Sequence, residues 1–124
     1  MIVAKVLVES RDKKGEEILL RLTKDHDWLV RVEACDSLCI SKSLETYNCL
    51  KNIAEEDTSG LVRGYAILSL GDIAEKIHRK EDLIKFLQKR RINEKIQFTQ
   101  INVYTVLYKL GLKENLMNLL SMFH

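Results

Sequence analysis

One fourteen-residue pattern occurs twice in this 124-residue chain. DHDWLVRVEACDSL begins at Asp25, DTSGLVRGYAILSL begins at Asp57, and the two copies are identical at seven positions without a gap. Every matching pair is separated by 32 residues. A period between about 20 and 50 residues is typical of proteins that stack one small structural unit upon the next. The sequence therefore predicts an array of similar units, with the two copies in equivalent places.

The hydrophobic residues recur every three or four positions, which is the spacing of one face of an α-helix. The chain has no proline and only 5 glycines, whereas a β-sandwich needs frequent turns. We therefore predict an all-α protein in which short links make consecutive helices antiparallel. The first ten residues also fit a strand, but we favour a helix there. The expected helices cover residues 1–10, 14–23, 28–40, 44–54, 61–77, 81–90, 94–110 and 116–123, with Asp25 or Asp27, Ser43 and Asn93 as caps.

Each copy carries a valine, an alanine and a leucine four residues apart, such as Val30, Ala34 and Leu38, which form one stripe along a helix. The small alanine lets a neighbouring helix approach closely. Beside the stripe stands an arginine, Arg31 or Arg63, which can reach an aspartate at a helix start. We predict a ladder of Asp–Arg interactions between stacked units, the alternative being two solvated arginines. The expected members of the ladder are Asp25, Arg31, Asp57 and Arg63.

The pattern D-x-x-x-x-V-R-x-x-A-x-x-x-L resembles the second helix of a HEAT repeat, especially the short HEAT-like type also found in phycocyanobilin lyases. GLVRGYAILSLGDIAEK matches it best, and DWLVRVEACDSL follows. The resemblance implies a right-handed α-solenoid of about three to four antiparallel helical hairpins, with the second helices lining a concave face. We expect one domain over residues 1–124, with clear repeats at 14–40 and 43–77 and a degenerate one at 81–124.

The degenerate third copy is placed by its last two residues. INVYTVLYKLG can be aligned with LVRGYAILSLG through Leu110 and Gly111, which gives an offset of 40 residues. No arginine then falls at the position of Arg63, so this alignment does not support a ladder in the third repeat.

No group of residues in the sequence has a spacing typical of catalysis. The histidines, His26, His78 and His124, do not pair with a glutamate or with one another at metal-ligand spacing on one helix. Cys35 and Cys39 are four residues apart, but no second pair of ligands accompanies them, and we favour buried, reduced thiols. We therefore predict a protein that is not an enzyme and that holds no metal or cofactor.

A basic cluster stands out although the net charge of the whole chain is only +2. Residues 76–95 hold eight Lys and Arg against three Asp and Glu. We favour a solvated surface, then an acidic protein partner, and then nucleic acid, because Phe86 is the only aromatic residue there on which a base could stack. The residues that would form this basic patch are Arg79, Lys80, Lys85, Lys89, Arg90 and Arg91.

The leading hypothesis for function is a scaffold that binds a protein partner through polar positions beside the stripe of the second helices. The alternatives are a nucleic-acid-binding protein that uses the basic cluster, and an accessory lyase-like or regulatory subunit. The sequence does not identify the partner. The expected contact residues are Glu33, Asp36, Tyr65, Ser69, Asp72, Gln97, Gln100 and Tyr104.

The two copies differ most at residues 26–28 and 58–60, where we expect whatever distinguishes one repeat from the other. Trp28 suits either an interface or the core, and we favour the core. No apolar run reaches the ~18 residues that span a bilayer, and no export signal is evident. We therefore expect a cytoplasmic protein that does not bind membranes. The apolar segment NLLSMFH at the C-terminal end leaves self-association open.

Overall fold

The computed structural model describes residues 13–112, and all the regular secondary structure in that part of the chain is helical. The predicted all-α class is confirmed, whereas the helices expected at 1–10 and 116–123 lie outside the described residues. The elements are α2 (Lys13–Leu22), α3 (Trp28–Ser37), the 3₁₀ helix η1 (Leu38–Ile40), α4 (Leu44–Glu56), α5 (Gly60–Lys76), α6 (Lys80–Asn93) and α7 (Gln97–Lys109).

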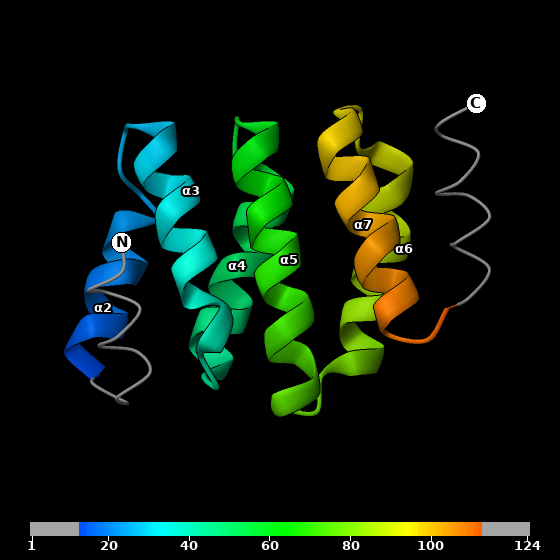
Figure 1. Ribbon diagram of the computed structural model, residues 1–124, viewed down its shortest axis with the longest axis horizontal. Coiled ribbons are helices and arrows are strands. Elements are labelled where there is room, and N and C mark those ends of the chain that lie inside the picture. Colours follow the sequence, from blue (N-terminus) through cyan, green and yellow to red (C-terminus); the bar gives the residue numbers. More distant parts are fainter. Residues whose placement is uncertain (1–12, 113–124) are drawn as a thin grey trace.

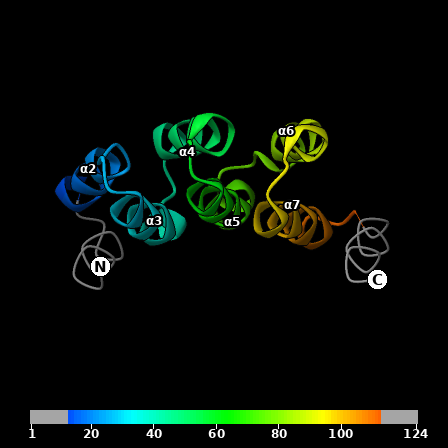
Figure 2. The same cartoon turned by 90° about the horizontal axis from the view of Figure 1, so that it is seen from above.

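The described helices form antiparallel pairs that lie side by side, α2 with α3, α4 with α5, and α6 with α7 (Figure 1). Seen from above, the first helices of the pairs form one row and the second helices form the other (Figure 2). In the middle of the array, α5 packs against α3, α4 and α7. This is the arrangement of an α-solenoid, and it confirms the predicted type of fold.

Short polar side chains mark most of the helix starts. Asp27 accepts a hydrogen bond from a backbone amide of α3 at 3.0 Å, and Ser43 does the same for α4 at 3.3 Å. The expectation that Asn93 caps the last described helix is wrong, because α6 extends to Asn93 and α7 begins only after Ile96. Ile96 is the N-cap residue and has no side-chain cap, whereas the Glu94 carboxylate accepts from the Ile96 amide at 3.1 Å just before the helix begins.

The hydrophobic core lies between the two rows. The predicted stripe is part of it, since Ala34, Leu38, Ala66 and Leu70 are all completely buried. Each fully buried leucine side chain contributes about 1.5–3 kcal/mol of hydrophobic stabilisation. Close packing also depends on Gly64 of α5, because a Cβ at this position would lie only 2.5 Å from a ring carbon of a phenylalanine in α7.

Arginine side chains connect each helix pair to the next. Arg31 donates through Nε and Nη2 to the carboxylate of Asp57, at 2.9 and 3.2 Å. Arg63, which lies 32 residues later, donates in the same way to Glu94, at 3.0 and 2.8 Å. Each arginine also donates through Nη1 to a backbone carbonyl six residues earlier, that of Asp25 at 2.9 Å or Asp57 at 2.7 Å. The acceptors Asp57 and Glu94 thus stand where the second helix of the following pair begins.

The third helix pair continues this ladder, but its residue offset from the second pair differs from the expected one. Gln100 stands six residues after Glu94, as Arg63 stands six residues after Asp57, and its Nε2 donates to the Glu94 carbonyl at 2.7 Å. The offset of the third repeat is therefore 37 residues, from Asp57 to Glu94, and the expected offset of 40 is wrong. A neutral glutamine replaces the arginine, so the side-chain ion pairs of the described ladder end at Glu94.

The expected offset of 40 is wrong because Gly71 and Gly111 have different roles in the structure. Gly71 lies inside α5, where a Cβ would be 3.0 Å from Val106 of α7. Gly111 follows the end of α7 and has a φ of 110°. Its counterpart after α5 is His78, with a φ of 57°. In both places the next amide donates to a carbonyl five residues earlier, at 2.8 and 3.0 Å, which is a common way to end a helix.

Glu94→Gln tests the contribution of the ladder to stability. The Glu94 side chain is completely buried, and Arg63 and Arg90 beside it are each only 14% exposed. Because the amide keeps the shape but removes the countercharge, we expect the free energy of unfolding in urea to fall by about 3 kcal/mol. Asp72→Asn removes an exposed ion pair with Lys109 and should cost less than about 1 kcal/mol. Equal losses in the two variants would contradict the structural role of the ladder.

Acid should weaken the same interaction. Burial favours a higher pKa for Glu94, but hydrogen bonds from Arg63 and the Ile96 amide, together with the charges of Arg63 and Arg90, outweigh it, and the net pKa is lowered. A lowered pKa in the folded state stabilises the fold above the unfolded value of about 4.3, and this stabilisation is lost as the pH falls through the folded-state value. We expect urea melts to show that wild type and Glu94→Gln converge in stability below about pH 4. A constant difference across that range would show that Glu94 is not the group responsible.

His78→Gly tests the end of α5. At a φ of 57° a histidine bears a steric cost that glycine does not. We expect thermal or urea denaturation to show a gain of about 0.5–1 kcal/mol in the free energy of unfolding. His78→Ala removes the same side chain but keeps a Cβ, so it should show no such gain. A stabilisation of equal size in both variants would point to the imidazole rather than the backbone.

Candidate interaction surfaces

Equivalent positions of the second helices place apolar side chains on one outer face of the array. Leu29, Leu61 and Phe98 are equivalent under the offsets of 32 and 37 residues, and the two leucines are 52% and 40% exposed. Half-buried Tyr65 lies on the same side of α5, and its ring centroid is 5.7 Å from that of Phe98. We call this surface the second-helix face; it belongs to the row of α3, α5 and α7 (Figure 2). Its members are Leu29, Glu33, Asp36, Leu61, Tyr65, Leu68, Asp72 and Phe98.

Carboxylates surround the apolar side chains of the second-helix face. Glu33 and Asp72 are exposed, and Asp36 is half-buried. The Lys109 amine of α7 donates to the Asp72 carboxylate of α5 at 2.6 Å, and this ion pair connects adjacent second helices across the surface. The face therefore offers aliphatic and aromatic contact area inside an acidic border.

Four of the expected contact residues lie elsewhere. Ser69 is 2% exposed and donates to the backbone carbonyl of Cys35 at 2.6 Å, because its small hydroxyl faces the junction of α5 with α3. Gln100 is bound to the Glu94 carbonyl in the ladder. Gln97, which is exposed, and Tyr104, which is half-buried, correspond under the 37-residue offset to Gly60 and Ile67, on the glycine-bearing side of α5 that packs against α7. The second-helix face retains Glu33, Asp36, Tyr65 and Asp72 from the expected set.

Trp28 lies at the first position of α3 and is 48% exposed, so the expectation that it packs in the core is wrong. In the next repeat the equivalent residue is Gly60, which packs beneath Ile96. The residue that corresponds to Ile96 one repeat earlier is the small Ser59, which offers little to cover an indole ring. The neighbouring His26 has a fully exposed side chain. The segment 26–28 therefore presents its two ring side chains to solvent.

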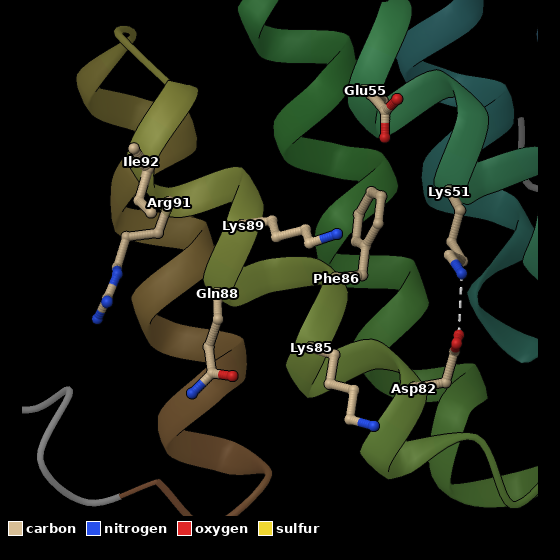
Figure 3. Close-up of a pocket in the computed structure, with 9 residues that line it drawn as sticks. All are labelled: Lys51, Glu55, Asp82, Lys85, Phe86, Gln88, Lys89, Arg91 and Ile92. Atoms are coloured by element: carbon tan, nitrogen blue, oxygen red, sulfur yellow. Dashed lines mark hydrogen bonds and ion pairs between the residues drawn. The ribbon is translucent and has the colours of Figure 1, made fainter.

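A groove of about 650 Å³ runs between α4 and α6, the neighbouring helices of the other row (Figure 3). Half-buried Phe86 lies in it, with the Lys51 amine 5.3 Å from the ring centroid. Figure 3 shows Lys89 directed toward Phe86, whereas Arg91 points away from α4. We call this feature the α4–α6 groove. The residues that line it are Lys51, Glu55, Asp82, Lys85, Phe86, Gln88, Lys89, Arg91 and Ile92.

One side of the α4–α6 groove is held by a short polar network. Asp82 accepts from the Tyr47 hydroxyl at 2.7 Å and from the Lys51 amine at 2.9 Å. These two hydrogen bonds lower the pKa of Asp82, although burial opposes them. Burial and the hydrogen bond to Asp82 raise the pKa of Tyr47. The network therefore connects α4 to α6 and neutralises the charge of Lys51.

The six residues of the predicted basic patch do not form one surface. Arg90 turns inward and pairs with the buried Glu94 at 3.4 Å, so its assignment to an exposed patch is wrong. Arg79 and Lys80 stand exposed at the opposite end of α6 from Arg91. The remaining three residues, Lys85, Lys89 and Arg91, line the α4–α6 groove.

The cysteines behave as packing residues in the described part of the chain. Burial is the main cause that raises the pKa of Cys35 to about 12, while Cys39 and Cys49 are half-buried. Within residues 13–112, no cluster of three or more His, Cys, Asp or Glu side chains is arranged to hold a metal ion. No helix in the same range combines the length and apolar character that a membrane crossing requires.

The basic cluster in the sequence predicted the residues that α6 contributes to the α4–α6 groove, but nothing predicted those that α4 contributes. Lys51 and Glu55 lie about 30 residues from the basic cluster, and nothing in their local pattern marks them. The available signal was the repeat itself, because the first helices of adjacent units must lie next to each other. Applied to residues 44–56 and 80–93, that rule places Lys51 beside α6.

Comparison with known families gives one result. Residues 1–71 match the family described as HEAT repeats, which is more than half of the 124-residue chain. Neither the curated proteins nor the solved structures gave a match. The family match ends within α5, yet the third helix pair continues the same stacking and receives Arg63 through Glu94. The chain therefore belongs to the HEAT-repeat family.

Proposed function

We propose that this HEAT-repeat chain is a protein-interaction scaffold that binds its partner on the second-helix face. The observation that carries the proposal is the pair Leu29 and Leu61, which occupy equivalent positions on adjacent helices and are 52% and 40% exposed. Together with Tyr65, they supply apolar area of the kind that is enriched at the centres of protein interfaces. HEAT repeats form helical scaffolds that often bind proteins, which agrees with this assignment.

The chemistry of the face also describes its partner. The border of Glu33, Asp36 and Asp72 suits a segment that carries Lys or Arg beside its apolar anchors. Asp72 already pairs with Lys109, so a competing cation would exchange one exposed ion pair for another at little net cost. Affinity would then come from the apolar contacts, and the carboxylates would select the charge of the partner.

The rigidity of the array supports recognition of this kind. Arg31 and Arg63 fix consecutive helix pairs through hydrogen bonds of 2.8–3.2 Å, and their acceptors are almost completely buried. A surface that is ordered before binding loses little conformational entropy when a partner docks. The second-helix face is therefore suited to binding as a rigid body.

A photo-crosslinking amino acid at position 61 tests the surface in the native host. We expect it to give discrete protein adducts that a crosslinker at Glu17, an exposed residue of α2 in the other row, does not give. The adduct identifies the partner, and the Leu29→Ser/Leu61→Ser variant should then bind it at least about tenfold more weakly, because both apolar anchors are removed. Calorimetric titration of the purified proteins provides the affinity.

A matched control is available on the other row. Ile18 and Leu44 are 42% and 46% exposed, so Ile18→Ser/Leu44→Ser makes the same chemical change away from the second-helix face. This variant should retain the wild-type affinity. Loss of binding in the control, with full binding by Leu29→Ser/Leu61→Ser, would place the interface on the first-helix row and overturn the proposal.

A further inference from the structure

The α4–α6 groove has a surplus of positive charge that the fold does not use. Lys51 is neutralised by Asp82 at 2.9 Å. Among residues 13–112, Lys85, Lys89 and Arg91 have no carboxylate within ion-pair distance, and Glu55 is the remaining acid in the lining. Unlike Arg90, which binds Glu94, these three cations stabilise no neighbouring helix. The groove is therefore electrostatically prepared for a negatively charged occupant.

The spacing of the cations suits an acidic segment of polypeptide. Lys85 and Lys89 lie one helical turn apart on the exposed side of α6, so their amines can engage two carboxylates of one short segment. Both side chains reach into the space between the helices, and Lys89 extends toward Phe86 (Figure 3).

The groove also offers apolar contact area beside these cations. Ile92 is 77% exposed, the largest exposure recorded for a large hydrophobic residue in the described chain. Phe86 is half-buried against the core and presents its remaining surface to the groove. An occupant that covers Ile92 must carry an aliphatic or aromatic group next to its negative charges.

We propose that the α4–α6 groove binds an acidic peptide segment of a partner protein. The carboxylates of the segment lie on Lys85 and Lys89, and one large apolar side chain packs against Ile92, about one helical turn beyond Lys89. The volume of about 650 Å³ accommodates a few side chains, which is the size of a short linear motif rather than a folded domain. This binding surface is separate from the second-helix face and does not depend on it.

Nucleic acid fits the groove less well, although it also carries negative charge. Asp82 and Glu55 line the same space and would repel phosphate groups. Among the described residues that line the groove, Phe86 is the one aromatic side chain, and one face of its ring lies beneath the Lys51 amine at 5.3 Å, so successive bases have little on which to stack. Arg79 and Lys80, which could extend a basic track, lie at the far end of α6.

Fluorescence anisotropy with the full chain tests the proposal. The probe is a labelled twelve-residue peptide rich in Glu and Asp with one central leucine, at about 50 mM salt, where screening is weak. We expect Lys85→Glu/Lys89→Glu to weaken binding by about tenfold or more, since attraction becomes repulsion. Lys42→Glu/Lys95→Glu makes the same charge change at exposed residues outside the groove and should change affinity by less than about twofold.

A double-mutant cycle tests the apolar contact. Ile92→Ser changes an exposed residue and leaves the fold intact, and it should weaken the leucine peptide about threefold or more. The same substitution should have almost no effect on a peptide in which serine replaces the leucine, because the contact is then already lost. Equal effects on the two peptides would show that Ile92 does not meet the apolar side chain, and would overturn the proposed binding mode.

The remaining outcomes decide the class of ligand. Weakening of the peptide by Lys85→Glu/Lys89→Glu but not by Lys42→Glu/Lys95→Glu supports the groove. Equal weakening by both variants shows a general charge effect and overturns the proposal. Binding of a twelve-nucleotide oligouridine with no binding of the acidic peptide also overturns it and assigns the surface to nucleic acid.

Discussion

The arginine that reaches from one helix pair to the next is the interaction on which the arrangement of this array depends. Arg63 holds the backbone carbonyl of Asp57 in its own repeat and the carboxylate of Glu94 in the following one. Glu94 in turn accepts the amide of Ile96, where the next second helix begins. One side chain thus fixes both the start of a helix and its position relative to its neighbour. The planar guanidinium can satisfy both partners at once, whereas a lysine amine offers no such fork.

The first two repeats could be predicted from sequence because this interaction requires particular residues at a fixed spacing. Asp57 and Arg63 recur at the same spacing as Asp25 and Arg31, and identical residues at identical spacing reveal the period. The third repeat is harder to recognise in the sequence, since Glu94 replaces the aspartate and Gln100 replaces the arginine. Its start is also displaced, because α5 has 17 residues whereas α3 has 10 before the chain turns into a 3₁₀ helix. The longer helix still fits the stacking, but it changes the residue offset between repeats, and a sequence comparison depends on a constant offset.

The surfaces were less predictable than the fold for a physical reason. Helical periodicity separates an inward side from an outward side, but a helix in a solenoid also has two lateral sides that contact its neighbours. Ser69 lies on one lateral side and donates to Cys35. Half-buried Tyr104 of the next repeat corresponds to the completely buried Ile67. Ser69 and Tyr104 are both polar residues at plausible outward spacing. Only the packing of α3 against α5 shows which of the positions reach solvent.

The charge of a sequence segment likewise differs from the charge of the surface that it forms. Residues 76–95 are strongly basic in sequence, yet Arg90 forms an ion pair with the buried Glu94 and is not part of the exposed surface. Asp82 of the same segment pairs with Lys51 of α4. What remains is a short cationic line on α6, on the row opposite the acidic border of the second-helix face. Because the ladder runs between the pairs and involves neither surface, a ligand can occupy one row without disturbing the other. The same arginine spacing that builds the array therefore leaves two independent faces with opposite charge.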